Sequence, residues 1–151
     1  MNYPTLNAYL TVEDAARAIE FYREAFGAKE RFRLTDPSTG RIGHAEIEIE
    51  DGLLMLADEN PAWGNRSPKT LGGSPCKMNL IVANADATFA RAVAAGAVAQ
   101  MPPTDMFYGF RNAGVRDPFG HEWMIQHKLR DVSPAEMQAG WEKMLRTGDC
   151  A

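Results

Sequence analysis

Apolar and polar side chains alternate over residues 6–12, which predicts a strand with one buried face. Asp14 follows as a suitable N-cap, and apolar residues then recur at spacings of three and four as far as Gly27. This spacing predicts a helix closed by a glycine in the left-handed conformation. Alternation and turn residues predict three further strands over 29–34, 44–49 and 53–57.

The same order of elements recurs about 70 residues later, as an internal repeat would produce. Leu10 and Val12 match Leu80 and Val82, and a Gly-Ala pair closes both units. The second unit predicts a strand over 77–82, then a helix over 85–95, then a strand over 97–101 that Pro102 and Pro103 close. Two last strands flank a turn at 117–120. The inward side of the second helix is predicted to carry Phe89, Ala92 and Val93.

The length favours one domain over residues 1–151, because each half is too short to bury a sufficient core alone. The predicted parts are a module over 4–59, a linker over 60–74, a module over 75–128 and a C-terminal helix over 133–147. Ser133 and Glu136 are spaced as a capping box for that helix. Its apolar stripe fits packing within its own subunit or on a partner, and both remain open.

The formal net charge is -4, and basic residues form no cluster that would suit nucleic acid. No apolar run is long enough for a membrane span, and the first residues lack a signal-peptide pattern. We therefore expect a cytoplasmic protein that binds neither nucleic acid nor membranes.

Each opening strand has one apolar face, which we expect to lie under the helices, and one face with polar side chains. The predicted fold class is α+β. Two βαβββ modules form a curved mixed sheet trough with helices on the outer face, and an extra C-terminal helix follows. Small ligands bind in clefts of this kind. The candidate ligand-binding residues are Asn7, Tyr9, His44, Glu46, Lys77, Asn79, Tyr108, Arg111, Glu122 and Met124.

Three motifs carry a family resemblance: Phe21-Tyr22 and Phe26-Gly27 in the first helix, Tyr108 to Arg111, and the stretch from Asp117-Pro118 to Trp123. Together they resemble the vicinal oxygen chelate superfamily over residues 4–128, most closely its short glyoxalase/bleomycin-resistance-like branch. The resemblance implies the two-module trough and a homodimer, sometimes formed by exchange of elements between subunits.

Metal-dependent members of that superfamily place His or Glu on four strands. The matching positions here hold Asn7, Leu56, Lys77 and Met124. None of these is a good ligand for a divalent metal, so no metal and no cofactor are expected. A second possible donor set is His44, Glu46 and Glu122.

These observations favour a metal-free small-molecule binding protein that resembles bleomycin-resistance proteins. The alternative is a metal-dependent lyase, isomerase or dioxygenase of the same superfamily, with His44, Glu46 and Glu122 as ligands. Without a metal, an enzyme would use Glu122 as a general base with its pKa adjusted by Lys77. Lys77 and Glu122 are predicted to form an ion pair that a ligand joins or breaks. Arg111 fits either a ligand carboxylate or phosphate, or a salt bridge to Asp105 or Glu122.

Overall fold

The computed structural model describes residues 2–151, so the first residue of the predicted domain lies outside the described part. The first module forms a four-stranded sheet in the order β1-β4-β3-β2, with β1 parallel to β4 and the other pairs antiparallel. Its elements are β1 (Ala8–Val12), α1 (Ala15–Phe26), β2 (Lys29–Thr35), β3 (Ile42–Ile49) and β4 (Gly52–Asp58).

The second module repeats this plan in a sheet of order β5-β8-β7-β6, again with its opening strand parallel to its last. Its elements are β5 (Lys77–Ile81), α3 (Ala85–Ala94), β6 (Val98–Asp105), β7 (Phe110–Arg116) and β8 (Glu122–Lys128). The α+β class and the two βαβββ modules are confirmed. Two short helices, η1 (Pro61–Trp63) and α2 (Pro68–Leu71), lie in the segment between the modules.

Local sequence signals set the ends of both long internal helices. The Asp14 side chain accepts a hydrogen bond from the amide of Arg17, and Gly27 ends α1 with a φ of 71°. The Asn84 side chain caps α3 in the same way, through the amide of Ala87. The two caps occupy equivalent places in the repeat, so the modules begin their helices by the same chemistry.

Strand β6 is longer than predicted, because it continues through Pro102 and Pro103 to Asp105. The strand lies at the edge of its sheet, and its pairing with β7 passes from Met101 directly to Thr104. A proline is tolerated at an edge or a bulge, where its missing N–H interrupts no central ladder. The prediction that the prolines close the strand was therefore wrong.

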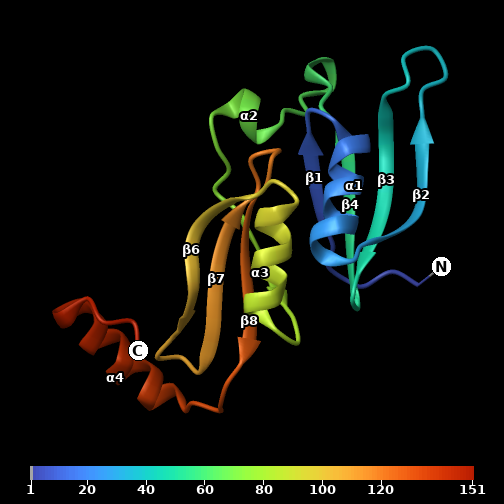
Figure 1. Ribbon diagram of the computed structural model, residues 1–151. Helices are drawn as coiled ribbons and strands as arrows, with labels where there is room; N and C mark the ends of the chain where they lie inside the picture. The colour runs from blue at the N-terminus through green and yellow to red at the C-terminus, as the bar shows by residue number, and fades with distance from the viewer. Residues whose placement is uncertain (1) are drawn as a thin grey trace.

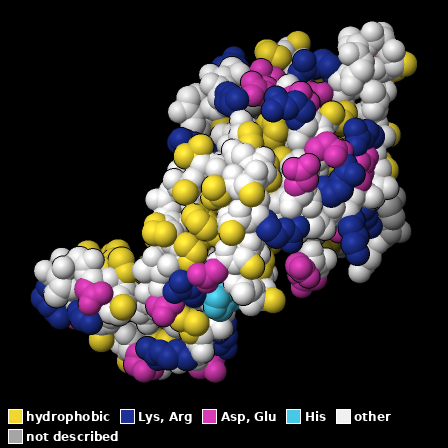
Figure 2. Space-filling view, viewed as in Figure 1, with side chains coloured by type: hydrophobic (Ala, Val, Ile, Leu, Met, Phe, Trp, Pro, Cys, Tyr) yellow, Lys and Arg dark blue, Asp and Glu magenta, His cyan; other side chains and the backbone are white. Residues whose placement is uncertain are grey.

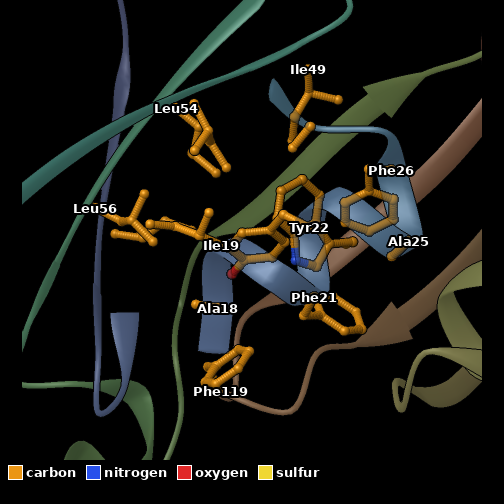
Figure 3. Packing of buried hydrophobic residues seen from close by; sticks show 14 of the residues in the cluster. Ala18, Ile19, Phe21, Tyr22, Ala25, Phe26, Ile49, Leu54, Leu56 and Phe119 are labelled. Atoms are coloured by element: carbon orange, nitrogen blue, oxygen red, sulfur yellow. The ribbon is translucent and has the colours of Figure 1, made fainter. Parts of the chain in front are cut away.

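Helices α1 and α3 pack against each other between the two sheets and share one hydrophobic core with them (Figure 1). On the first module, Ile19 and Tyr22 of α1 face Leu54 and Leu56 of β4 (Figure 3). On the second, Ala92 is buried and Phe89 packs on the core, as predicted. The inward placement of Val93 was wrong, since its side chain is 38% exposed.

A buried aspartate joins the two modules. Asp117 lies in the turn before β8, and its Oδ2 accepts hydrogen bonds from the Tyr22 hydroxyl at 2.7 Å and from Trp123 Nε1 at 2.9 Å. Its Oδ1 accepts from the amides of Phe119 and His121. Because Tyr22 belongs to α1, this carboxylate fixes the first helix against the second sheet.

Each sheet has one face covered by a helix and one open face. No strand of one sheet pairs with a strand of the other within residues 2–151. Aromatic side chains of α1 also reach the covered side of the second sheet, where Phe26 lies 4.6 Å from Trp123 between ring centroids. The helices therefore occupy the space between the sheets, and the opposite face of each sheet is left open.

Helix α4 (Pro134–Thr147) projects from the end of the second sheet (Figure 1). Its predicted capping box is present, with Ser133 and Glu136 in reciprocal contact. Gly140 lies against Phe107, since an added Cβ would meet that ring at 2.6 Å. No residue of α4 is buried, so its apolar stripe stays largely exposed.

Candidate functional site

The first open face is formed by the uncovered side of β1-β4-β3-β2 and centres on Tyr9, Phe32, His44 and Glu46. The Tyr9 hydroxyl lies 3.0 Å from His44 Nδ1, and His44 Nε2 lies 3.4 Å from Glu46 Oε1. The rings of Tyr9 and Phe32 flank the imidazole at 5.6 and 5.7 Å between centroids. Three predicted binding residues thus form one connected group.

Glu46 is the most deeply placed acidic group on this face, with 2% of its surface exposed. Arg31 Nη1 lies 3.3 Å from Glu46 Oε2, and Arg31 Nε lies 3.4 Å from Glu48 Oε1. The guanidinium also stacks over the ring of Tyr3, at 5.1 Å from its centroid. Arg31 therefore balances a carboxylate that would be costly to bury alone.

The second open face is the uncovered side of β5-β8-β7-β6, and Lys77 and Glu122 lie at one end of it. Lys77 Nζ is 3.3 Å from Glu122 Oε2, which confirms the predicted ion pair. Gln100 Nε2 donates a hydrogen bond of 3.0 Å to Glu122 Oε1. The pKa of Glu122 is held below its ordinary value, chiefly by the hydrogen bond from Gln100. The hydrogen bond and the positive charge of Lys77 lower this pKa further. A lowered pKa makes this carboxylate a weaker base, which counts against Glu122 as a general base.

Amide side chains occupy the middle of the second open face. Gln126 Nε2 donates to Asn79 Oδ1 at 2.6 Å, and Asn112 lies opposite Gln126 on β7. Asn112 is only 6% exposed, and its Oδ1 has no hydrogen-bond partner in the described part of the chain. Burial raises the pKa of Tyr108, and a hydrogen bond from Asn112 lowers it in part.

A cavity of about 330 Å³ opens on this second face. Lys77, Gln100, Asn112 and Met124 are among its walls. The cavity thus combines an ammonium group, a thioether and a buried carbonyl oxygen that has no hydrogen-bond partner within residues 2–151. Polar groups of this kind in a partly apolar hollow are typical of a small-molecule site.

Some predicted residues lie elsewhere. Arg111 is on the helix-covered side of β7, where Asp86 holds it at 2.6 and 2.8 Å and Asp105 at 2.7 Å. Its side chain is therefore engaged away from both open faces, and the salt bridge to Asp105 is confirmed. Asn7 precedes β1 and donates to the carbonyl of Pro4 at 2.8 Å.

The superfamily's metal positions do not fit a metal here. Leu56 is fully buried in the core beneath the sheet, and Lys77 presents a cation that is already paired with Glu122. The second donor set is divided, because His44 and Glu46 lie on β3 and Glu122 begins β8 of the other sheet. Within residues 2–151 no three His, Cys, Asp or Glu side chains are grouped to hold a metal ion.

Sequence reasoning missed several residues of the open faces, above all Arg31, Phe32, Gln100 and Asn112. A break in register between Glu30 and Phe32 lets Arg31 and Phe32 both reach the open face, and a bulge of this kind leaves no clear signal in the sequence. Asn112 could have been found, because it alternates with Ala113 and Val115, which are the apolar residues of the other side of the strand.

A larger cavity of about 440 Å³ lies at the end of β3 and β4, beside the segment between the modules. Trp63 and Arg41 line it, together with Asp58 and Glu59. The two Asp58 oxygens already accept from the amides of Ala15 and Ile42. Trp63 thus borders this end cavity and does not line the cavity on the second open face.

Comparison with known proteins places the chain in a family. A model of the Glyoxalase/Bleomycin resistance protein/Dioxygenase superfamily matches residues 5–125. The chain belongs to this superfamily. An uncharacterized protein of Mycobacterium bovis is 41% identical over 139 residues, which cover 90% of this chain and 91% of the relative.

Solved structures of the superfamily's fold are also similar. A gene product of Arabidopsis thaliana has a TM-score of 0.64 and 28% identity, covering 82% of this chain and 98% of that one. TioX from Micromonospora sp. ML1 has a TM-score of 0.63 and 28% identity, covering 84% and 100%. Among the described residues, no helix has the length and apolar character needed to cross a membrane.

Proposed function

We propose that this superfamily member is a small-molecule binding protein whose ligand lies on the open faces of its sheets without a metal ion. The observation that carries the proposal is Asn112, a buried amide that lines the cavity with Lys77. Its Oδ1 has no hydrogen-bond partner among the described residues. Buried polar atoms normally have hydrogen-bond partners. A ligand with an N–H or O–H group would supply the missing donor.

The walls of the second face suggest the kind of ligand. Asn79, Gln126 and Asn112 can donate as well as accept hydrogen bonds, while Met124 offers a soft apolar surface. Lys77 is more than half exposed and can turn from Glu122 towards an oxygen of the ligand. These groups suit a ring-bearing molecule with both donor and acceptor groups.

Binding without a metal is supported by the chemistry of the donor positions. The positions that match the superfamily's metal ligands hold Asn7, the buried Leu56, Lys77 and Met124. The ammonium group of Lys77, which is paired with Glu122, would repel a metal cation there. Elemental analysis of purified protein, with a chelator-treated control, tests this. One stoichiometric transition metal per subunit would contradict the proposal.

We further propose that the protein is a homodimer in which a second copy completes the trough. Each chain presents two open sheet faces, and no strand pairing joins the two sheets in residues 2–151. Ile81 and Val98, on the two edge strands of the second sheet, are 53% and 54% exposed. Figure 2 shows hydrophobic side chains gathered over the second module, while charged ones dominate the first. A native mass spectrum should show two chains, and a monomer at micromolar concentration would contradict the proposal.

Substitution of Lys77 by Met tests the ligand site. The change keeps the length of the side chain and removes its charge, so the affinity of an oxygen-bearing ligand should fall about tenfold, or about 1.4 kcal/mol. Lys69→Met is the matched control, because Lys69 is a similarly exposed lysine paired with Glu13 away from the open faces. A panel of small molecules is screened by native mass spectrometry. Unchanged binding of a confirmed ligand by Lys77→Met would exclude contact with this lysine.

A further inference from the structure

The first open face carries a chain of three titratable groups that leads from solvent into the protein. Tyr9 is 50% exposed, its hydroxyl contacts His44 Nδ1 at 3.0 Å, and His44 Nε2 lies 3.4 Å from the buried Glu46. The second contact is long, as contacts between catalytic groups often are before a ligand binds. The three groups are therefore ordered by depth, with the hydroxyl outermost.

The hydrogen-bonding capacity of each group sets the direction of the chain. An ionised carboxylate only accepts, so the imidazole presents its Nε2 proton to Glu46 and leaves Nδ1 to accept from Tyr9. Burial raises the pKa of Tyr9, so its hydroxyl carries its proton at neutral pH. In this order the imidazole can act as a base towards the hydroxyl, and the carboxylate orients the imidazole. This is the arrangement by which proteins activate a hydroxyl group.

The carboxylate at the inner end of the chain of groups is itself held by a cation. Arg31 Nη1 lies 3.3 Å from Glu46 Oε2, while Glu46 Oε1 is the oxygen nearest to His44. Glu46 therefore has one oxygen directed to Arg31 and the other to the imidazole.

The same face indicates which ligand would use the chain. Tyr9 and Phe32 lie on either side of the imidazole ring, and Met55 is the cross-strand partner of both Tyr9 and Glu46. This is a flat, partly apolar surface that suits an aromatic ring. The exposed Tyr9 oxygen can accept a hydrogen bond at its edge, so the ring should carry a hydroxyl.

We propose that Tyr9, His44 and Glu46 form a proton relay that ionises a phenol bound on the first open face. The phenol O–H proton passes to Tyr9 Oη while the original Tyr9 proton passes to His44 Nδ1. The products are a phenolate, which accepts a hydrogen bond from the neutral Tyr9 hydroxyl, and an imidazolium held by Glu46. This inference rests on the proposed function, since the phenol is a ligand of the open faces.

The test uses 4-nitrophenol, whose phenolate and neutral forms absorb at different wavelengths. The full chain is titrated into the probe in a buffer more acidic than the probe's own pKa, and binding is measured separately by equilibrium dialysis. The wild-type protein should produce a saturable phenolate band. Tyr9→Phe and His44→Gln should reduce that band at least tenfold at equal occupancy, because both keep a side chain of similar size and lose the proton acceptor.

Two matched variants separate the relay from the general charge of the face. Tyr3→Phe and Glu48→Gln alter a tyrosine and a carboxylate that contact Arg31 but lie outside the relay, so the phenolate band should persist in both. A bound but neutral probe, a band that persists in His44→Gln, or no binding of the probe would each overturn the inference. The proposed function is tested separately by Lys77→Met. If Lys77→Met weakens the binding of another ligand, the proposed function stands even when one of these three results overturns the relay.

Discussion

Loss of the Tyr22 hydroxyl should lower the free energy of unfolding, because this hydroxyl joins the first helix to the second module. Tyr22 is fully buried, and its hydroxyl donates to Asp117 Oδ2 at 2.7 Å. A hydrogen bond to a charged group contributes about 1.5–3 kcal/mol. Asp117 keeps three other donors in Tyr22→Phe, so no carboxylate oxygen is left alone. We therefore expect the free energy of unfolding to fall by about 2 kcal/mol, in the lower part of this range.

Urea unfolding followed by tryptophan fluorescence measures this change. With a slope of about 2 kcal/mol per M, the midpoint should fall by about 1 M while the slope stays the same. Tyr3→Phe is the control, because Tyr3 is 47% exposed and should change the stability by less than about 0.5 kcal/mol. A loss below about 0.5 kcal/mol in Tyr22→Phe, at unchanged slope, would refute the reasoning.

The pH dependence gives an independent check. Burial, followed by the negative charge of Asp117 and the hydrogen bond to it, raises the pKa of Tyr22 well above its ordinary value. The unfolded state therefore loses this proton first, and the contribution of Tyr22 is complete below pH about 10 and declines above it. Since Tyr22→Phe has no such proton, the stability difference between wild type and variant should shrink by up to about 1.4 kcal/mol per pH unit above pH 10.

Two further predictions concern the core and a turn. Leu56→Ala should lower the free energy of unfolding by about 2–5 kcal/mol, because Leu56 is fully buried, whereas Leu34→Ala at a 59% exposed position should have little effect; urea unfolding distinguishes them. Gly109→Ala should cost more than Gly27→Ala in a thermal unfolding assay. Both glycines have a positive φ, which costs an alanine about 1–2 kcal/mol. Only at Gly109 would the new Cβ also meet a backbone oxygen, because the carbonyl oxygen of Arg130 would lie 2.6 Å away. Equal losses at the two glycines would show that the contact with Arg130 relaxes freely.

Much of the fold was predictable because its signals are local. The alternation over 6–12 and 77–82, the caps Asp14 and Asn84 and the capping box at Ser133 each depend on residues within a few positions. The failures arose where long-range context outweighs a local rule. Pro102 and Pro103 remain in β6 because the strand lies at an edge, which is a property of the sheet.

The candidate site was predictable only in part, for the same reason. The pair of Lys77 and Glu122 followed from placing the opening strand beside the last one, and the structure confirms it. The sequence left two roles open for Arg111, because its position on β7 relative to α3 depends on strand register. Asp86 and Asp105 hold it there, and the first of them belongs to α3.

The sequence by itself determined that this protein is a repeat of two βαβββ modules, each with one apolar and one polar side to its opening strand. Side-chain alternation and helix caps are consequences of backbone geometry over a few residues. Only the tertiary structure decided that Tyr9 meets His44, 35 positions away, and that Tyr22 meets Asp117, 95 positions away. Such contacts depend on strand register, on the bulge that turns Arg31 towards Glu46, and on the packing of α1 between two sheets. These are long-range properties, and no short stretch of sequence encodes them.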